Sequence, residues 1–242
     1  MGVMLQVLDH FERSRAWWRG HSDATWELTP SVYRCGRSAK EFSFANKFRT
    51  EAPVRIAKLA PADDALESWL FLMQHYGVPT RLLDWSYSPL TALYFAVHDT
   101  ARYSQPGCLW ALYPGKLNKR QTGHHRIYTG GSATVKPIIR CAFSSECTEE
   151  SKRIVAITPP KHDLRQLVQL GASTMHGLSD PLESLKYGDE ILLKFEIPAD
   201  AKPVLDAALK MFGISRSTVF PDLESLAKDI AEENFAMPEF GE

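Results

Sequence analysis

Two segments in the first half of the chain place apolar residues at the spacing of one helix face, i, i+3, i+4 and i+7. After the first segment come Gly77, which suits a left-handed helix end, and Pro79, which prevents continuation of the helix. The second segment begins at Ser88, a preferred N-cap residue, with Pro89 at the first helical position. The apolar positions are Leu66, Trp69, Leu70 and Met73 in the first segment and Leu90, Leu93, Tyr94 and Val97 in the second. The pattern predicts two helices that each bury one face.

Shorter patterns predict the remaining elements. Strands are expected at residues 16–20, 108–113, 153–158 and 191–197, with a short apolar piece at 82–85. Further helices are expected around Met4, Leu8 and Phe11, from Ala39 to near Pro53, from Asp200 to Gly213, and from Pro221 onward. Because helices and strands mix without regular β-α-β alternation, the chain is assigned to the α+β class, with a mixed or antiparallel sheet flanked by helices.

The chain has no internal repeat and no linker rich in proline or glycine. We therefore expect a single domain over residues 1–242, with a core of roughly 14–235. Residues 116–147 are rich in Gly, Thr, Ser and basic side chains, which predicts a long loop or excursion. A basic cluster within it is either a solvated surface or a contact for phosphates; its members are Lys116, Lys119, Arg120, His124, His125 and Arg126.

Composition narrows the class of protein. With 44% hydrophobic and 24% charged residues, the chain is globular rather than disordered, and a net charge of -1 argues against an indiscriminate binder of nucleic acid or membranes. No apolar run approaches the roughly 18 residues of a membrane span, and the N-terminus lacks the pattern of a secretory signal. The four cysteines form no CxxC pair and suit a reducing compartment better than a disulfide scaffold. These features predict a cytoplasmic protein with no membrane contact.

The first candidate site is the segment Trp18-Arg19-Gly20-His21-Ser22. Arg19 offers a bidentate guanidinium at a strand end, and Gly20 lets the backbone approach a ligand closely. The competing interpretation is an arginine that pairs with a carboxylate and only braces the fold.

The second candidate site is the polar run between the two predicted helices, residues 74–89. Polar groups beside a core must bond one another or face a cleft. In the first case Arg81 pairs with Asp84, and Asp84 orients His75. In the second, the helix that follows Ser88 presents free N–H groups to an anion such as phosphate.

A third polar segment, residues 165–176, includes Gln169 and is explained by a helix end running into a strand. The histidines have no zinc-ligand spacing such as HExxH, so no metal is expected. No GxSxG elbow, P-loop or GxGxxG motif occurs.

Three motifs together resemble the FRG domain family. They are W-W-R-G-H-S from Trp17, L-x-P-S-V-Y-R from Leu28, and the long run Q-H-Y-G-V-P-T-R-L-L-D-W-S-x-S-P-L-T-A-L-Y-F-A from Gln74. The family is named for an aromatic-Arg-Gly triplet, here Trp18-Arg19-Gly20, with tryptophan in place of phenylalanine. The similarity runs from Trp17 to about Gly171 and implies a bacterial or phage-associated domain.

The same residues are similar, more weakly, to the ADP-ribosyltransferase superfamily. Arg19-Gly20 matches its first motif, and Ser86-Tyr87-Ser88 before the helix of Tyr94 resembles its second. In the third motif, Gln169-Leu170-Gly171 carries glycine where the superfamily has a catalytic glutamate. This resemblance implies an ADP-ribosyltransferase-like fold and NAD as the substrate. With the polar segments above, the residues that we expect around NAD are Arg19, Ser86, Ser88, His75 and Gln169 as catalytic groups, and Arg19, Gly20, Ser22, Arg81, Asp84 and Tyr94 as binding groups.

We therefore expect an NAD-handling, ADP-ribosyltransferase-like enzyme in bacterial defence or toxin biology, with a protein or nucleic acid as its macromolecular target. The alternative is a module that binds a nucleotide or a nucleic-acid end without chemistry. A third hypothesis is a nuclease-like activity that uses His75 and the basic cluster.

Overall fold

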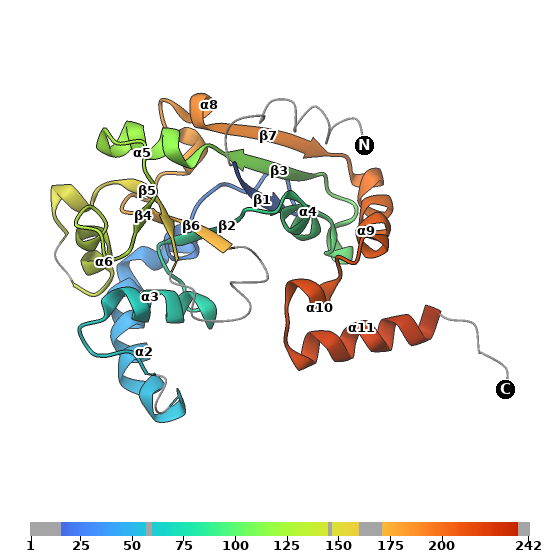
Figure 1. Cartoon of the computed structure of the whole chain (residues 1–242), viewed down its shortest axis with the longest axis horizontal. Coiled ribbons are helices and arrows are strands. Elements are labelled where there is room, and N and C mark those ends of the chain that lie inside the picture. The colour runs from blue at the N-terminus through green and yellow to red at the C-terminus, as the bar shows by residue number, and fades with distance from the viewer. Residues whose placement is uncertain (1–15, 57–59, 145–146, 160–170, 237–242) are drawn as a thin grey trace.

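The computed structural model describes residues 16–56, 60–144, 147–159 and 171–236 (Figure 1). A sheet of seven strands crosses the molecule in the order β4-β5-β6-β2-β1-β3-β7. The pairs are antiparallel except for β4 and β5, which are parallel. The strands are β1 (Trp17–His21), β2 (Leu82–Ser86), β3 (Gly107–Leu112), β4 (Tyr128–Thr129), β5 (Ile154–Thr158), β6 (Gly171–His176) and β7 (Leu192–Ile197). This confirms the α+β class and the mixed sheet.

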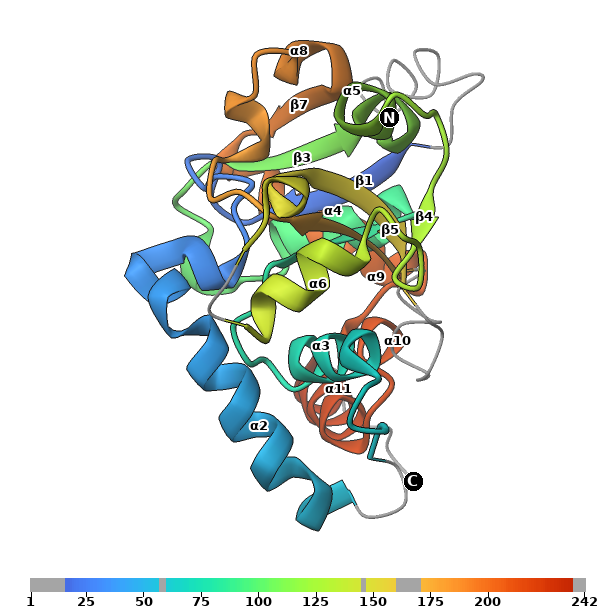
Figure 2. The ribbon, with the colours of Figure 1, turned by 90° about the vertical axis from the view of Figure 1, so that its left-hand side faces the viewer.

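Helices surround the sheet, as Figure 2 shows for the side that carries α2, α3 and α6. The α-helices are α2 (Glu41–Ile56), α3 (Leu66–His75), α4 (Pro89–Val97), α5 (Pro114–Thr122), α6 (Lys136–Ala142), α8 (Gly188–Ile191), α9 (Lys202–Met211), α10 (Arg216–Val219) and α11 (Leu223–Ala236). The 3-10 helices are η1 (Ser31–Lys40), η3 (Thr100–Arg102), η4 (Glu149–Ser151), η5 (Leu182–Ser184) and η6 (Ala199–Ala201). Both helices predicted from apolar spacing, α3 and α4, are confirmed.

The core lies on both faces of the sheet because successive strand residues point to opposite sides. In β2, Leu82 packs with α3 and α6 on one face, whereas Leu83 packs on the other with Leu117 of α5. In β1, Trp17 belongs to the same cluster as Leu83, while Trp18 packs with Ala92 of α4. Helix α4 thus covers the centre of the sheet, beside β1.

The prediction of a long loop at residues 116–147 is wrong. This segment holds most of α5, strand β4 and all of α6. Its polar, basic composition reflects helices with one solvated face rather than irregular backbone. The buried sides are supplied by Leu117 and Asn118 in α5 and by Ile138 and Ile139 in α6.

Cys141, at the end of α6, forms a disulfide with Cys147, while Cys108 is free and buried. The sequence favoured a reducing compartment, where disulfides are rare, and this disulfide does not support that interpretation. The cytoplasmic location therefore stays a prediction. Within the described residues, no helix has the length and apolar character needed to cross a membrane. The expected opening helix around Met4 lies outside the described residues.

Candidate functional site

The two central strands of the sheet separate at one end, and a cavity opens where they part. Strand β1 is in register with β3 along its whole length, from Trp17↔Leu112 to His21↔Cys108. With β2 it shares only the pair Trp18↔Ser86. Beyond that pair, Arg19 Nη1 donates to the backbone oxygen of Asp84 at 2.6 Å, so a side chain bridges the strands there.

The cavity has a volume of about 400 Å³. Its charged lining residues are Arg19, Arg34, Asp84 and Asp99. Its aromatic walls are Trp18, Trp26, Trp85 and Phe95, and hydroxyl groups come from Ser22, Ser86 and Thr91. A pocket of this size that combines apolar walls with a few polar groups is typical of a small-molecule site.

Arg19 is held so that part of its guanidinium remains available. Its Nε donates to His21 Nε2 at 2.9 Å, and Nη1 donates to Asp84 as described above. Among the described residues, Nη2 has no hydrogen-bond partner. Burial lowers the pKa of Arg19 to about 10, partly offset by the nearby Asp84, so the guanidinium stays protonated at neutral pH. A charged fork with an unused edge is suited to bind a phosphate or carboxylate.

His21 orients that guanidinium and must be neutral to do so. Its Nδ1 lies 3.2 Å from the backbone oxygen of Trp26, which can only accept a hydrogen bond, so Nδ1 carries the proton. Nε2 is then free to accept from Arg19. Burial and the positive charge of Arg19 lower the pKa of His21 to about 3, which favours this neutral tautomer.

Asp84 supplies a carboxylate to the same cavity. Gln74 Nε2 donates to its Oδ2 at 2.6 Å, and Ser173 Oγ donates to its Oδ1 at 3.5 Å. These donors come from α3 and β6, so two elements fix the carboxylate beside Arg19. Asp84 and Asp99 are the two acidic residues that line this cavity.

Gly20 serves the fold in a way that the sequence analysis did not foresee. A Cβ atom at this position would lie 1.8 Å from the backbone oxygen of Ala92 and 2.7 Å from the backbone nitrogen of Ala96. The backbone that approaches this glycine closely is therefore helix α4, which packs directly on β1. Gly20 also lines the cavity.

The predicted helix start at Ser88 is confirmed, but its consequence for anion binding is smaller than expected. Ser88 Oγ accepts from the backbone nitrogen of Thr91 at 3.2 Å. Ser86 Oγ accepts from the backbone nitrogen of Ser88 at 3.0 Å. Because Pro89 has no N–H, the start of α4 keeps few donors for a ligand.

Arg81 is placed differently from the predicted bracing network. It pairs with Glu41 of α2, with Nε at 2.9 Å from Glu41 Oε1, and donates to the backbone oxygen of Ile138 at 3.0 Å. Arg81 and Glu41 are 3% and 4% exposed, so both are buried away from the cavity. The pairing of Arg81 with Asp84, one of the two alternatives that the sequence left open, is wrong because α2, distant in sequence, provides the carboxylate.

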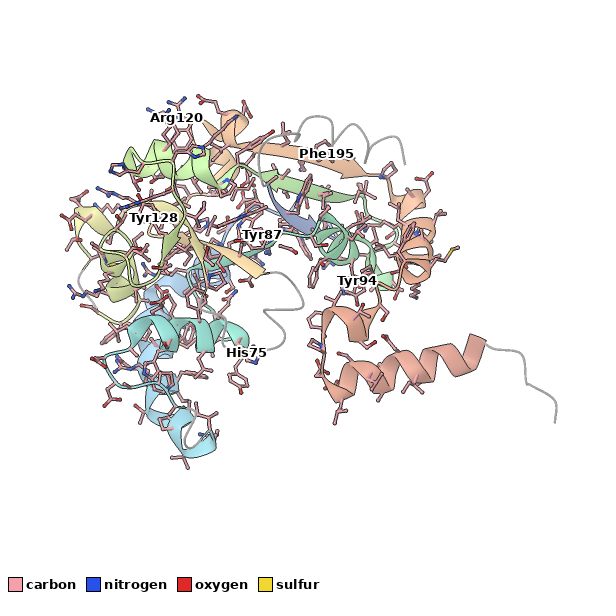
Figure 3. The ribbon with its side chains drawn as sticks, in the orientation of Figure 1. His75, Tyr87, Tyr94, Arg120, Tyr128 and Phe195 are labelled. Atoms are coloured by element: carbon pink, nitrogen blue, oxygen red, sulfur yellow. A yellow bond between two sulfur atoms is a disulfide. The ribbon has the colours of Figure 1, made fainter. Side chains whose placement is uncertain are left out.

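Three other predicted residues lie outside the cavity lining. His75 lies at the end of α3 (Figure 3), where its ring meets Tyr76 edge-on at 4.8 Å. Tyr94 is buried in α4 and stacks on His98 at 4.4 Å between ring centroids. Ser88 acts as the N-cap described above. Gln169 lies outside the described residues.

The cavity also contains residues that the sequence analysis did not select as a site. Arg34 belongs to the motif L-x-P-S-V-Y-R, so its place in that motif was a usable signal. His98 and Asp99 form a polar pair directly after the apolar run of α4. Trp26, 40% exposed, carried no signal because its neighbours form no periodic pattern.

A metal site was not expected. In the part of the chain that the structure describes, no group of three or more His, Cys, Asp or Glu side chains is placed to hold a metal ion.

Comparison with known proteins identifies one relationship. The family model of the FRG domain matches residues 14–105, fewer than half of the 242 residues. The match contains β1, β2 and α4 and ends before β3, whereas the resemblance in sequence was expected to reach Gly171. No curated protein and no solved structure matches this chain. Residues 14–105, which match the model of the FRG domain, supply every lining residue named above.

Proposed function

We propose that the cavity between β1 and β2 binds a nucleotide and that its substrate is NAD, as in an ADP-ribosyltransferase-like enzyme. The observation that carries this proposal is the convergence of Arg19, Asp84 and Ser86 on one cavity. The weaker sequence resemblance to that superfamily supports NAD in particular. The macromolecular target and a role in bacterial defence or toxin biology remain predictions.

The charges in the cavity suit the two chemical parts of such a ligand. The unused edge of the Arg19 guanidinium is suited to a pyrophosphate oxygen, because charge-assisted bonds to phosphate are strong. Asp84 and Ser86 offer acceptors for the hydroxyl groups of a ribose. The cavity volume of about 400 Å³ lies in the lower part of the range for ligand pockets, ~300–1,000 Å³. In this proposal one half of the dinucleotide fills the cavity and the other half extends outside it.

The proposed reaction breaks the bond between nicotinamide nitrogen and C1′ of the ribose. Nicotinamide leaves with the bonding electron pair, and positive charge develops on the ribosyl ring. A nucleophilic oxygen or nitrogen of water or of the target then bonds to C1′ and loses a proton to solvent. In this scheme the Asp84 carboxylate, fixed by Gln74 and Ser173, stabilises the developing cation electrostatically. In the superfamily a glutamate has this role, and the corresponding position in this chain is Gly171.

The test is to incubate the purified protein with NAD and candidate macromolecules and to measure nicotinamide release. Asp84→Asn keeps the shape of the side chain and removes its charge. Loss of one preorganised electrostatic group typically costs about 10²–10³-fold in turnover, so we expect a decrease of that size with NAD affinity changed much less. Arg19→Ala should instead weaken NAD binding.

The matched control is Lys210→Ala, because Lys210 is exposed on α9, outside the cavity lining, and forms an ion pair with Asp206. It should leave both binding and release unchanged. The proposal is wrong if NAD does not bind, or if Asp84→Asn releases nicotinamide at the rate of the unmodified protein.

A non-catalytic nucleotide-binding module is the second candidate, and one observation favours it. Gly171 of β6 is paired with Ser86, so the position expected to carry the catalytic glutamate adjoins the cavity without a side chain. In this case calorimetry would detect nucleotide binding that depends on Arg19, while no nicotinamide is released with any target.

A further inference from the structure

Trp26 is the aromatic lining residue of the cavity that folding leaves open to water. Trp18 and Trp85 are 5% and 3% exposed, and Phe95 is half-buried. Trp26, in contrast, is 40% exposed. Because an indole ring is a large, mostly apolar surface, its exposure in a cavity wall leaves apolar area that a ligand can cover.

The loop that carries Trp26 is tied to distant parts of the chain. Lys202 is fully buried in α9, and its Nζ donates to the backbone oxygen of Ser22 at 2.6 Å. Lys194 Nζ of β7 donates to the backbone oxygen of Ala24 at 2.7 Å. Two lysines from two different elements therefore fix the loop between β1 and Trp26.

Arg102 fixes the indole ring itself. Its Cζ lies 4.7 Å from the centroid of the Trp26 ring, a cation–π contact. Two carboxylates hold the guanidinium there, with Asp23 Oδ2 at 3.5 Å from Nη1 and Asp99 Oδ2 at 3.6 Å from Nε. The backbone oxygen of Arg102 accepts from Lys202 Nζ at 2.7 Å. The ring is thus oriented by the same contacts that anchor the loop.

Within the described residues, no aromatic ring stacks on Trp26. His21 approaches it with 6.0 Å between ring centroids, and the two ring planes are inclined by 62°. A parallel ring on this indole would therefore have to come from a ligand.

A fixed aromatic ring is suited to bind another planar ring. A side chain that is already ordered loses little conformational entropy when the ligand arrives. Nucleobases stack on such rings whatever their hydrogen-bonding pattern, because every base has a π-face. The contacts around Trp26 therefore point to a planar heteroaromatic ring as the group that covers it.

Hydrogen bonds connect Trp26 to the other groups of the cavity in a defined order. Arg19 Nη1 donates to the backbone oxygen of Asp84, and Arg19 Nε donates to His21 Nε2. His21 Nδ1 lies 3.2 Å from the backbone oxygen of Trp26 and donates to it. In this series Arg19 stands between Asp84 and Trp26.

The same order is found along an NAD molecule. In the binding mode proposed above, Arg19 contacts the pyrophosphate and Asp84 lies by the nicotinamide ribose. Adenosine is attached to the other side of the pyrophosphate, so it extends toward Trp26. The half of the dinucleotide that leaves the cavity thus passes the exposed aromatic residue of the lining.

We propose that Trp26 is the base subsite of the cavity and that the adenine ring of NAD stacks on its indole. The inference rests on the proposed function, because it takes the cavity as the site for NAD. It adds which half of the dinucleotide lies at Trp26.

The test compares two halves of the dinucleotide by calorimetry. ADP carries adenine and NMN carries nicotinamide, and each also has a ribose and a phosphate. Replacing a stacking aromatic residue by alanine typically weakens binding of a base by about 5- to 150-fold. Trp26→Ala should lower the affinity for ADP and NAD by that factor and leave the affinity for NMN within about twofold.

A second variant keeps an aromatic ring and gives a spectroscopic readout. Trp26→Phe should bind ADP nearly as tightly as the unmodified protein, because phenylalanine also stacks on bases. ADP should quench the tryptophan fluorescence of the unmodified protein. At saturating ADP this quenching should be largely lost in Trp26→Phe, since the stacked indole is absent. A purely structural role of Trp26 would not produce this combination.

The matched control is Tyr76→Ala, which removes another exposed aromatic side chain. Tyr76 is 59% exposed and lies outside the cavity lining. This variant should bind ADP and NMN as the unmodified protein does. Equal unfolding midpoints in urea would exclude misfolding of Trp26→Ala, and if that variant unfolds, the fluorescence of Trp26→Phe decides.

Three results would overturn the inference: unchanged ADP affinity in folded Trp26→Ala, a loss of NMN affinity as large as the loss for ADP, or full quenching in Trp26→Phe. If NAD binding depends on Arg19 and is the same in Trp26→Ala, this inference alone is wrong. If NAD, ADP and NMN all fail to bind, the proposed function is wrong as well.

Discussion

The substitution Gly20→Ala tests the contact on which the position of the cavity depends. Gly20 lies where β1 packs on α4, and an alanine Cβ would be 1.8 Å from the backbone oxygen of Ala92. Real Cβ contacts are essentially never below 3.0 Å, so strand and helix must move apart. No side-chain rotation can relieve the clash because the atoms met first belong to the helix backbone.

The expected cost follows from that geometry. Overpacking a well-packed core costs about 1–3 kcal/mol, occasionally more, and rigid neighbours place this case at the upper end or above it. We therefore expect Gly20→Ala to lower the free energy of unfolding by about 3 kcal/mol or more, a large share of the ~5–15 kcal/mol typical of a domain. Nucleotide affinity should fall as well, because α4 carries Thr91 and Phe95 into the cavity.

Urea unfolding followed by tryptophan fluorescence measures the effect. The matched control is Gly131→Ala, where a new Cβ would come no closer than 4.0 Å to Glu67, and which should change the free energy of unfolding by no more than about 0.5 kcal/mol. A loss below about 1 kcal/mol for Gly20→Ala would refute the argument that β1 and α4 are in direct backbone contact.

Three further predictions concern Arg81, His21 and Ser88. Arg81→Ala leaves the carboxylate of Glu41 buried and unpaired, so urea unfolding should show a free energy of unfolding lower by about 3–5 kcal/mol. The double variant Arg81→Met/Glu41→Leu removes both charges and should recover most of that loss. An equal loss in the single and the double variant would contradict this reasoning. Folding lowers the pKa of His21 to about 3, so between about pH 6.5 and pH 3 the unfolded state binds a proton that the folded state does not. The free energy of unfolding should therefore decrease as pH falls through this range, by at most about 1.4 kcal/mol per pH unit from this group. Titration of stability in His21→Gln should show a shallower slope than in the unmodified protein, and an unchanged slope would count against a neutral His21. Ser88→Ala removes the side-chain oxygen that caps the backbone nitrogen of Thr91 and should lower the free energy of unfolding by about 1 kcal/mol. Calorimetry on the folded variant should show no loss of nucleotide affinity beyond what this lower stability explains.

Elements with strong local signals were predictable in detail. In α4, the cap residue Ser88, the proline at the first helical position and the apolar spacing all act within a few residues. The left-handed Gly77 after α3 is equally local, with φ of 75°. Segment 116–147 was misjudged because its helices are short and mostly polar outside, so composition outweighed the few apolar positions that anchor them.

The candidate site was predictable only in part. The motif residues Arg19, Asp84 and Ser86 do meet in one cavity, as their place in β1 and β2 allowed. The partner of Arg81 was not predictable, because Glu41 lies 40 residues away in the chain and many carboxylates compete for one arginine in the sequence. A buried ion pair depends on packing that brings two distant elements together, which periodicity does not encode.

By itself the sequence determined the α+β class, the helices α3 and α4 and the set of polar motifs, because each rests on interactions between residues close in the chain. The tertiary structure decided the strand order, the separation of β1 from β2, and therefore the cavity. It also decided that Gly20 accommodates helix α4, since only the packed fold shows which backbone approaches that glycine. Contacts between distant elements depend on which surfaces are buried against each other, and this depends on the packing of the whole chain.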